Sequence, residues 1–237
     1  LGTQTNQMDP PLNQINIKIN GQPIDCISTN TTDKSTKFLG IHVDDKLTWK
    51  KHINQVCKKI GQGIFIMNKV KNFMSKSTLL TLYHSLVHCH LNYGIQIWGN
   101  ATKINEVFKL QKRAIRLINK SPYRCHTEPL FKQNNILKVE DIYKLQTALF
   151  MYDVNYNIAP ASLHKSLIAP KPNTSSIVTR RSSNLHTDRP RRTFSSKLPK
   201  HCFPRLWNEI DETIRASKSR KIFKKTIKQN LIDKYYK

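Results

Sequence analysis

The feature that most constrains this sequence is a long stretch in which apolar residues recur every three or four positions. Polar and basic residues fill the positions between them, and Thr48 just ahead is a residue type that caps helices. The apolar residues are Trp49, Ile53, Val56, Ile60, Ile64, Met67 and Val70. This is the spacing of one helix face, so the stretch predicts a long amphipathic α-helix that buries one side.

Four later segments show the same helical spacing of apolar residues. The first follows Ser77, which we expect to cap it, and the second carries apolar residues from Ile104 to Ile118. The third runs from about 139 to 152, and the last runs from about 219 to 236 with a lysine-rich outer face. The low glycine count, 7 in 237 residues, also favours helices over turn-dense β folds.

The sequence ahead of the long helix has β-strand patterns. Isoleucines alternate with polar residues from position 15, and Asn20-Gly21 is a type I′ turn signal, so residues 15–27 predict a β-hairpin. The apolar stretch 38–43 predicts one further strand that ends at Asp44-Asp45. The expected fold class is therefore mainly α, with a short N-terminal β-hairpin and strand, a helical bundle and a small helical tail.

Between residues 155 and 204 the helical pattern gives way to Pro, Ser, Thr and Arg. Six prolines interrupt this segment, which we expect to be an extended, partly flexible and basic linker. Residues 180–205 contain one acid, Asp188, against eight cations: Arg180, Arg181, Arg189, Arg191, Arg192, Lys197, Lys200 and Arg205. With so few apolar residues, this part should be mobile until nucleic acid binds it.

The charge balance predicts a polyanionic partner. Lys and Arg outnumber Asp and Glu by 40 to 15, which gives a formal net charge of +25. Nucleic acid is favoured over a membrane surface, because no stretch approaches the roughly 18 apolar residues of a spanning helix. The N-terminal residues also lack the basic-then-apolar pattern of a secretory signal.

The five cysteines are odd in number, scattered, and never form a C-x-x-C pair. This usage is typical of reduced thiols, so we expect a nuclear or cytoplasmic protein that is not secreted.

Two clusters resemble metal sites, and we expect neither to bind metal. Asp44-Asp45 looks like the acid pair of a polymerase, but a two-metal site needs another carboxylate, and the residues that follow open a helix. We expect the pair to lie in a turn and stabilise the helix start. His84, His88 and His90 surround Cys89 on one expected helix without a second ligand pair at zinc-finger spacing.

Four sequence blocks, in one order, resemble the reverse transcriptases of Jockey-like non-LTR (LINE-type) retrotransposons. The blocks are KFLGIHVDDKLTW at 37–49 with His52-Ile53, LNYGI at 91–95 with Trp98-Gly99, LQKRAIR at 110–116, and WNEI at 207–210 with 214–215 and 223–225. The family usually has Leu-Pro where this chain has Glu209-Ile210, so the fourth block is weaker. The resemblance covers about residues 15–235.

The resemblance implies four parts of a polymerase. Residues 1–47 would be the end of the palm with a primer-grip-like strand, and 48–154 a helical thumb-like domain. Residues 155–204 would be the basic linker, and 205–237 a helical C-terminal tail. In the family, the catalytic Asp-Asp turn lies upstream of the first block, so this chain would lack it.

The resemblance also implies where nucleic acid binds. Lys37, Phe38, Leu39 and Gly40 would form the primer grip; Gly40 would allow a sugar-phosphate to approach closely, or relieve a crowded strand. Lysines of the long helix would follow the backbone of an RNA–DNA hybrid, whose recognition depends on shape and charge. They are Lys50, Lys51, Lys58 and Lys59, and the linker would add Arg180, Arg181, Arg189, Arg191 and Arg192.

The implied function is that of part of an RNA-directed DNA polymerase from a mobile element, which binds template–primer in target-primed reverse transcription. Such a part would be inactive alone, would need no cofactor of its own, and would leave Mg²⁺ to the palm of the same polyprotein. Two alternatives are a domesticated or relic nucleic-acid-binding protein and a protein–protein interaction module. Salt dependence of binding separates the last from the other two.

Overall fold

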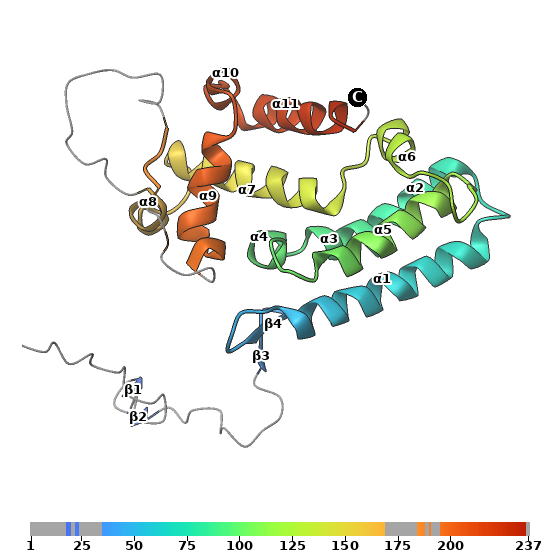
Figure 1. Cartoon of the computed structure of the whole chain (residues 1–237), viewed down its shortest axis with the longest axis horizontal. Coiled ribbons are helices and arrows are strands. Elements are labelled where there is room, and N and C mark those ends of the chain that lie inside the picture. The colour runs from blue at the N-terminus through green and yellow to red at the C-terminus, as the bar shows by residue number, and fades with distance from the viewer. Residues whose placement is uncertain are drawn as a thin grey trace, which may run out of the picture.

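A computed structural model describes residues 35–168, 184–187, 190 and 195–235, together with the backbone of residues 18, 19, 22 and 23. Helices dominate the described residues, and short antiparallel strand pairs precede them (Figure 1). This confirms the expected mainly α fold with an N-terminal β-hairpin. None of the described helices combines the length and the apolar character that crossing a bilayer would take.

Two strand pairs lie ahead of the helices. β1 (Lys18–Ile19) pairs with β2 (Gln22–Pro23), at the position of the expected hairpin. The prediction of a single strand at residues 38–43 is wrong. β3 (Ser35–Phe38) and β4 (Ile41–Asp44) pair instead as a second hairpin, with Leu39 and Gly40 as its turn.

The first helix confirms the periodic pattern from which it was predicted. α1 (Lys50–Val70) buries Ile53, Val56, Ile60, Ile64 and Met67 along one side and packs against α5 (Ile104–Ile118). The prediction that Thr48 caps the helix is wrong. The residue before α1 is Trp49, whose backbone lies in the left-handed region and whose side chain makes no capping hydrogen bond.

The segment after α1 is helical from residue 76 to residue 92. It comprises α2 (Lys76–Tyr83), the π-helical turn η2 (His84–His88) and α3 (Cys89–Asn92). Ser75, and not Ser77, caps it, since its hydroxyl oxygen accepts from the Thr78 amide at 3.2 Å. A short helix, α4 (Ile95–Trp98), follows Gly94, whose φ is +60°.

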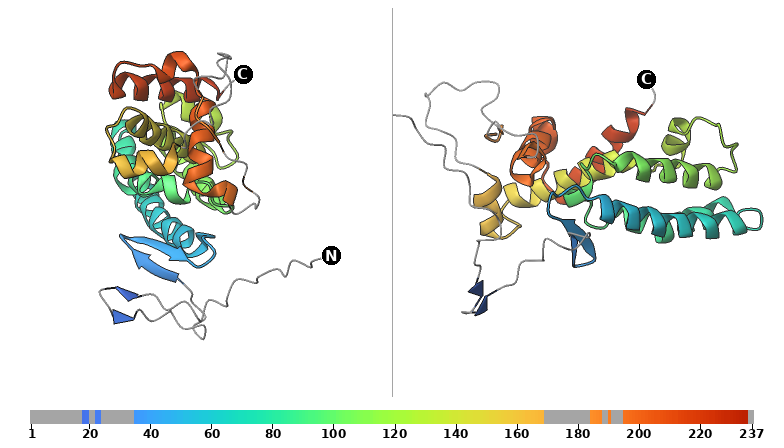
Figure 2. Two further views of the ribbon diagram at one scale, coloured as in Figure 1. Left: turned by 90° about the vertical axis from the view of Figure 1, so that its left-hand side faces the viewer. Right: turned by 60° about the horizontal axis from the view of Figure 1, so that its bottom comes forward.

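Helix α7 (Val139–Asn155) lies in the middle of the molecule and is buried on most sides (Figures 1 and 2). It follows α6 (Glu128–Gln133) and is joined to α5 by buried Gln111. The Gln111 amide nitrogen donates to Tyr83 Oη at 3.0 Å and to the Leu137 carbonyl at 2.8 Å, while its oxygen accepts from the Val139 amide at 2.8 Å. A polar side chain is thus fully satisfied inside the core.

The C-terminal helices pack on the same core. After α8 (Ala161–Leu167) and the short turn η3 (Ser195–Lys197), α9 (Pro199–Asn208) and α11 (Arg220–Asp233) lie against α7, and α10 (Glu212–Arg215) connects them. The Phe223 ring lies 4.8 Å from that of Tyr152 and 5.8 Å from that of Trp207.

Parts of the expected linker, 155–204, are therefore helical. α8 lies inside it, and α9 begins at Pro199 with Pro204 within the helix. Proline at the first helical position gives up no hydrogen bond, and the burial of Cys202, Phe203 and Trp207 offsets the one bond that Pro204 removes. The linker arginines Arg180, Arg181, Arg189, Arg191 and Arg192 lie outside the described residues.

Candidate nucleic-acid interface

The β3–β4 hairpin presents apolar side chains to solvent at its tip. Phe38 is 68% exposed and Leu39 is 74% exposed, and Lys37 is exposed beside them. The hairpin lies at the edge of the helical body, as Figure 2 shows. Exposed large apolar groups on a projecting tip are typical of a contact surface.

The backbone of the tip is held in an unusual conformation. Leu39 has φ of 45° and Gly40 has φ of 79°, and a type I′ turn requires positive φ at both central residues. Leucine rarely adopts this region, so the surroundings must stabilise it. The Tyr93 hydroxyl does so, because it donates to the Leu39 carbonyl at 2.6 Å.

The role of Gly40 follows from its φ angle. A Cβ at this position would meet the Tyr93 ring at 3.7 Å, which is ordinary van der Waals contact. The strand is therefore not crowded at Gly40, and the glycine is required by the left-handed turn.

The Asp44 carboxylate holds the turn that leads into α1. Its carboxylate accepts from the Thr48 amide at 2.7 Å, the Thr48 hydroxyl at 2.8 Å and the Trp49 amide at 2.8 Å. Partial burial alone would raise the pKa of this carboxyl, but the hydrogen bonds from Thr48 and Trp49 outweigh it and hold the pKa below its usual value. This confirms the expected position of Asp44 in a turn ahead of the helix, whereas Asp45 is exposed.

Among the residues that the structure describes, no group of three or more His, Cys, Asp or Glu side chains could hold a metal ion. His84 and His88 lie with their ring centroids 5.2 Å apart. Burial, together with the nearby positive charges of His84, Lys228 and Lys224, lowers the pKa of His88 to about 4. Cations, and not a ligand set, surround this pair.

The lysines expected to follow the nucleic-acid backbone lie on α1 away from its buried stripe. Lys50, Lys58 and Lys59 are exposed, and Lys51 is half-buried. At about 100° per residue, Lys51 and Lys58 share one direction, while Lys50 and Lys59 flank them on opposite sides. The four charges therefore cover about half of the helix circumference, and the hairpin tip precedes the same helix.

A basic hollow at the corner of α5 and α6 was missed by the sequence analysis. Lys112, Arg116 and Arg124 line it beside Phe108, and its volume is about 630 Å³. The single acid in its lining, Glu128, is paired with Lys138. Arg116 is oriented by its Nε–H, which donates to the Cys125 carbonyl at 2.9 Å. Within the described ranges, none of these three cations has an ion-pair partner. Unpaired Arg and Lys side chains in a hollow suit phosphate oxygens.

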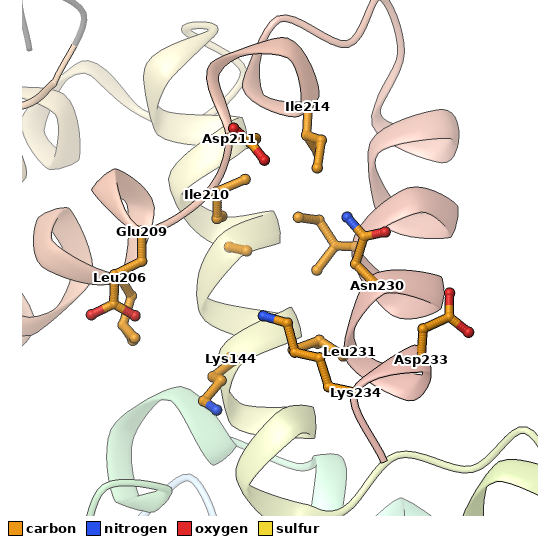
Figure 3. A pocket seen from close by; sticks show the side chains of 12 residues that line it. Lys144, Leu206, Glu209, Ile210, Asp211, Ile214, Asn230, Leu231, Asp233 and Lys234 are labelled. Carbon is orange, nitrogen blue, oxygen red and sulfur yellow. The ribbon is translucent and has the colours of Figure 1, made fainter. Parts of the chain in front are cut away.

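A different hollow, of about 380 Å³, lies among α7, α9, α10 and α11. Figure 3 shows carboxylates of Glu209 and Asp211 on one side and Asp233 on α11, with Lys144 and Lys234 between them. With three acids against two lysines, this hollow has no excess of positive charge to attract a polyanion.

Comparison with known proteins gives relatives of one kind. Over 136 residues, 55% of this chain, it is 29% identical to the "RNA-directed DNA polymerase from mobile element jockey" of Drosophila melanogaster. Over 119 residues, 48% of the chain, it is 33% identical to the "Probable RNA-directed DNA polymerase from transposon BS" of the same species. The "Probable RNA-directed DNA polymerase from transposon X-element" of the same species is 26% identical over 113 residues, 45% of the chain.

These relatives confirm the resemblance to Jockey-type non-LTR retrotransposon polymerases. The matched part of the chain spans 15%, 13% and 12% of the three relatives, in the same order. No family model and no solved structure matches the chain.

Proposed function

From this similarity to RNA-directed DNA polymerases of mobile elements, we propose that the chain is the part of such a polymerase that holds template–primer nucleic acid. The β3–β4 hairpin tip carries the proposal. Phe38 and Leu39 are exposed there in a strained turn, Lys37 adds a positive charge, and Tyr93 anchors the turn to the helices. A rigid apolar tip beside a cation suits the sugar-phosphate end of a primer strand.

Helix α1 supplies the electrostatic part of the interface. Its 21 residues span about 30 Å, and lysines lie near its start and its middle. Contacts from lysine to phosphate position a duplex without reading its sequence. The chain should therefore bind RNA–DNA hybrid or structured RNA with little sequence preference.

Catalysis would come from the upstream palm and fingers of the same polyprotein, in the nucleus or cytoplasm. Asp44 accepts three hydrogen bonds from Thr48 and Trp49, so its carboxylate is committed to holding the turn ahead of α1. The palm would hold the Mg²⁺ ions, and this chain would position the primer and grip the duplex.

The direct test is the affinity of the purified chain for an RNA–DNA hybrid at several salt concentrations. We expect log K to fall linearly with log salt, with a slope of roughly −0.7 to −0.9 per neutralised phosphate. Changing Lys50, Lys51, Lys58 and Lys59 together to Gln should weaken binding and flatten the slope. The matched control changes Lys144, Lys218, Lys221 and Lys234, exposed lysines outside α1, and removes the same charge.

Affinity that does not depend on salt would contradict the proposal and favour the protein–protein module. An equal loss in the two quadruple variants would show that net charge, and not α1, governs binding.

A further inference from the structure

An apolar hollow of about 350 Å³ lies between the end of the β3–β4 hairpin and the helical body. Three segments far apart in sequence line it: residues 46–49, residues 97–102 at the end of α4 and in the loop after it, and residues 197–199. The apolar part of its lining comes from Leu47, Trp49, Ile97 and Pro199. Two exposed lysines, Lys46 and Lys197, also line the hollow.

The first wall is built from strained backbone. Leu47 has φ of 47° and Trp49 has φ of 62°, in the left-handed region that side chains with a Cβ rarely adopt. The Asp44 carboxylate holds this conformation through the amides of Thr48 and Trp49. Conformations of this kind persist where the surroundings over-determine them, and they cluster at binding sites.

The opposite wall is also tied in place. The Asn100 amide nitrogen donates to the Lys197 carbonyl at 2.9 Å, which joins the turn before α9 to the loop after α4. Both walls are therefore held by hydrogen bonds of the chain itself, and the hollow is formed before a ligand arrives.

We propose that this hollow binds the base of one unpaired nucleotide of the bound nucleic-acid strand, and that Lys46 and Lys197 bind the phosphates next to that base. The inference rests on the proposed function and adds a subsite to it. A volume of 350 Å³ is at the small end for ligand sites, which suits one nucleotide. Apolar walls accept the flat face of any base, and the lysines select a ligand that carries negative charge.

The position of the hollow supports the same ligand. Lys46 follows β4 by two residues, so the hollow lies at the opposite end of the hairpin from its exposed tip. The strand of β4 spans about 10 Å, the axial length of about three nucleotides in a duplex strand. One nucleic-acid strand can therefore contact both ends of the hairpin.

The test uses the whole chain and an RNA–DNA hybrid with a short single-stranded overhang. Each overhang position is replaced in turn by an abasic nucleotide, which keeps the phosphate and removes the base. We expect one position at which loss of the base weakens binding about fivefold or more, the lower end for base stacking on protein side chains.

The main variant is Ile97→Glu, which places a carboxylate in the mouth of the hollow at a residue that is 46% exposed. Ile222→Glu on α11, 56% exposed, is the matched control with the same charge change. Sensitivity to the abasic position should vanish in Ile97→Glu and remain in Ile222→Glu. If Ile97→Glu melts below its control, Lys46→Gln with Lys197→Gln replaces it, against Lys218→Gln with Lys221→Gln.

Three outcomes would overturn the inference. A chain that binds no hybrid would overturn the proposed function together with this subsite. Binding that is insensitive to every abasic position would overturn the subsite alone. If Ile97→Glu leaves nucleic-acid affinity unchanged but weakens association with the upstream polymerase portion, the occupant is a protein segment.

Discussion

The Tyr93 hydroxyl donates a hydrogen bond of 2.6 Å to the carbonyl oxygen of Leu39, across 54 residues of sequence. This bond ties the tip of the β3–β4 hairpin to the corner between α3 and α4. Tyr93→Phe keeps the ring that packs on Gly40 and removes only the hydroxyl. We expect a stability loss of about 1 kcal/mol, faster amide exchange at the tip, and weaker hybrid binding.

Tyr156→Phe is the matched control for this prediction. The Tyr156 hydroxyl donates to the Arg215 carbonyl at 2.9 Å, and its side chain is similarly exposed. The control should lose comparable stability without changing hybrid affinity. Equal affinity losses in the two variants would count against a role of the hairpin tip in binding.

Asp44 should be important for stability, and Asp45 should not. Asp44→Ala leaves the Thr48 and Trp49 amides without their acceptor, at a cost of about 2 kcal/mol in the free energy of unfolding. Asp45→Ala changes an exposed side chain and should stay within about 0.5 kcal/mol of the parent. Chemical denaturation measures both, and Mg²⁺ should alter neither curve. Equal effects of the two changes would argue for a paired, metal-binding role.

The purified chain should not extend a primer. With template, primer, nucleotides and Mg²⁺ present, we expect no product, because the described acids do not gather into a metal site. A longer polymerase that includes an upstream Asp-Asp turn is the positive control. Extension that Asp44→Ala and Asp45→Ala abolish would make this pair catalytic.

Two glycines of α1 should respond oppositely to substitution by alanine. A Cβ at Gly63 would lie 2.8 Å from the Leu86 carbonyl oxygen and 3.0 Å from the Leu86 Cβ, so η2 would have to move. We expect Gly63→Ala to destabilise the fold by about 2 kcal/mol. Gly61 has nothing within 4 Å of that position, so Gly61→Ala should stabilise α1 by about 0.5 to 1 kcal/mol. Thermal melting of the two variants checks the pair.

Helices α1 and α5 were predictable because each buries one face in a shared core. Apolar residues recur at helical spacing along α1 and α5, and most of those in the periodic pattern are buried. The turn at Leu39 was not predictable, because leucine at positive φ gives no local signal and Tyr93 supports it from a distant segment. α9 was missed for a related reason: its two prolines are local breakers, and only tertiary packing of Phe203 and Trp207 shows that they are tolerated.

Only the part of the candidate site that consists of consecutive residues was predictable from the sequence. Lys37 to Gly40 adjoin one another in sequence and form one hairpin tip. The basic hollow of Lys112, Arg116 and Arg124 draws on a helix and a later loop, and the hollow near Trp49 draws on three segments. Such groupings arise from packing, so no spacing in the sequence marks them.

Stability should fall as the pH is lowered from about 6.5 to about 4, because the fold favours the neutral imidazole of buried His52 and of half-buried His88. Burial lowers the pKa of His52 to about 4, helped by the charges of His42 and Lys59, and burial likewise lowers that of His88 to about 4. In the unfolded chain both titrate near 6.5, so below that pH the unfolded state takes up protons first and is favoured.

His52 is only 4% exposed, and its share of the loss of stability is at most about 3 kcal/mol. The carboxyl of Asp44, with its lowered pKa, adds a loss of the same sign only at more acid pH. Urea unfolding at a series of pH values measures the slope, which His52→Gln should reduce. A stability that stays constant from pH 6.5 to 4.5 would show that both imidazoles take up protons within the fold as readily as in the unfolded chain.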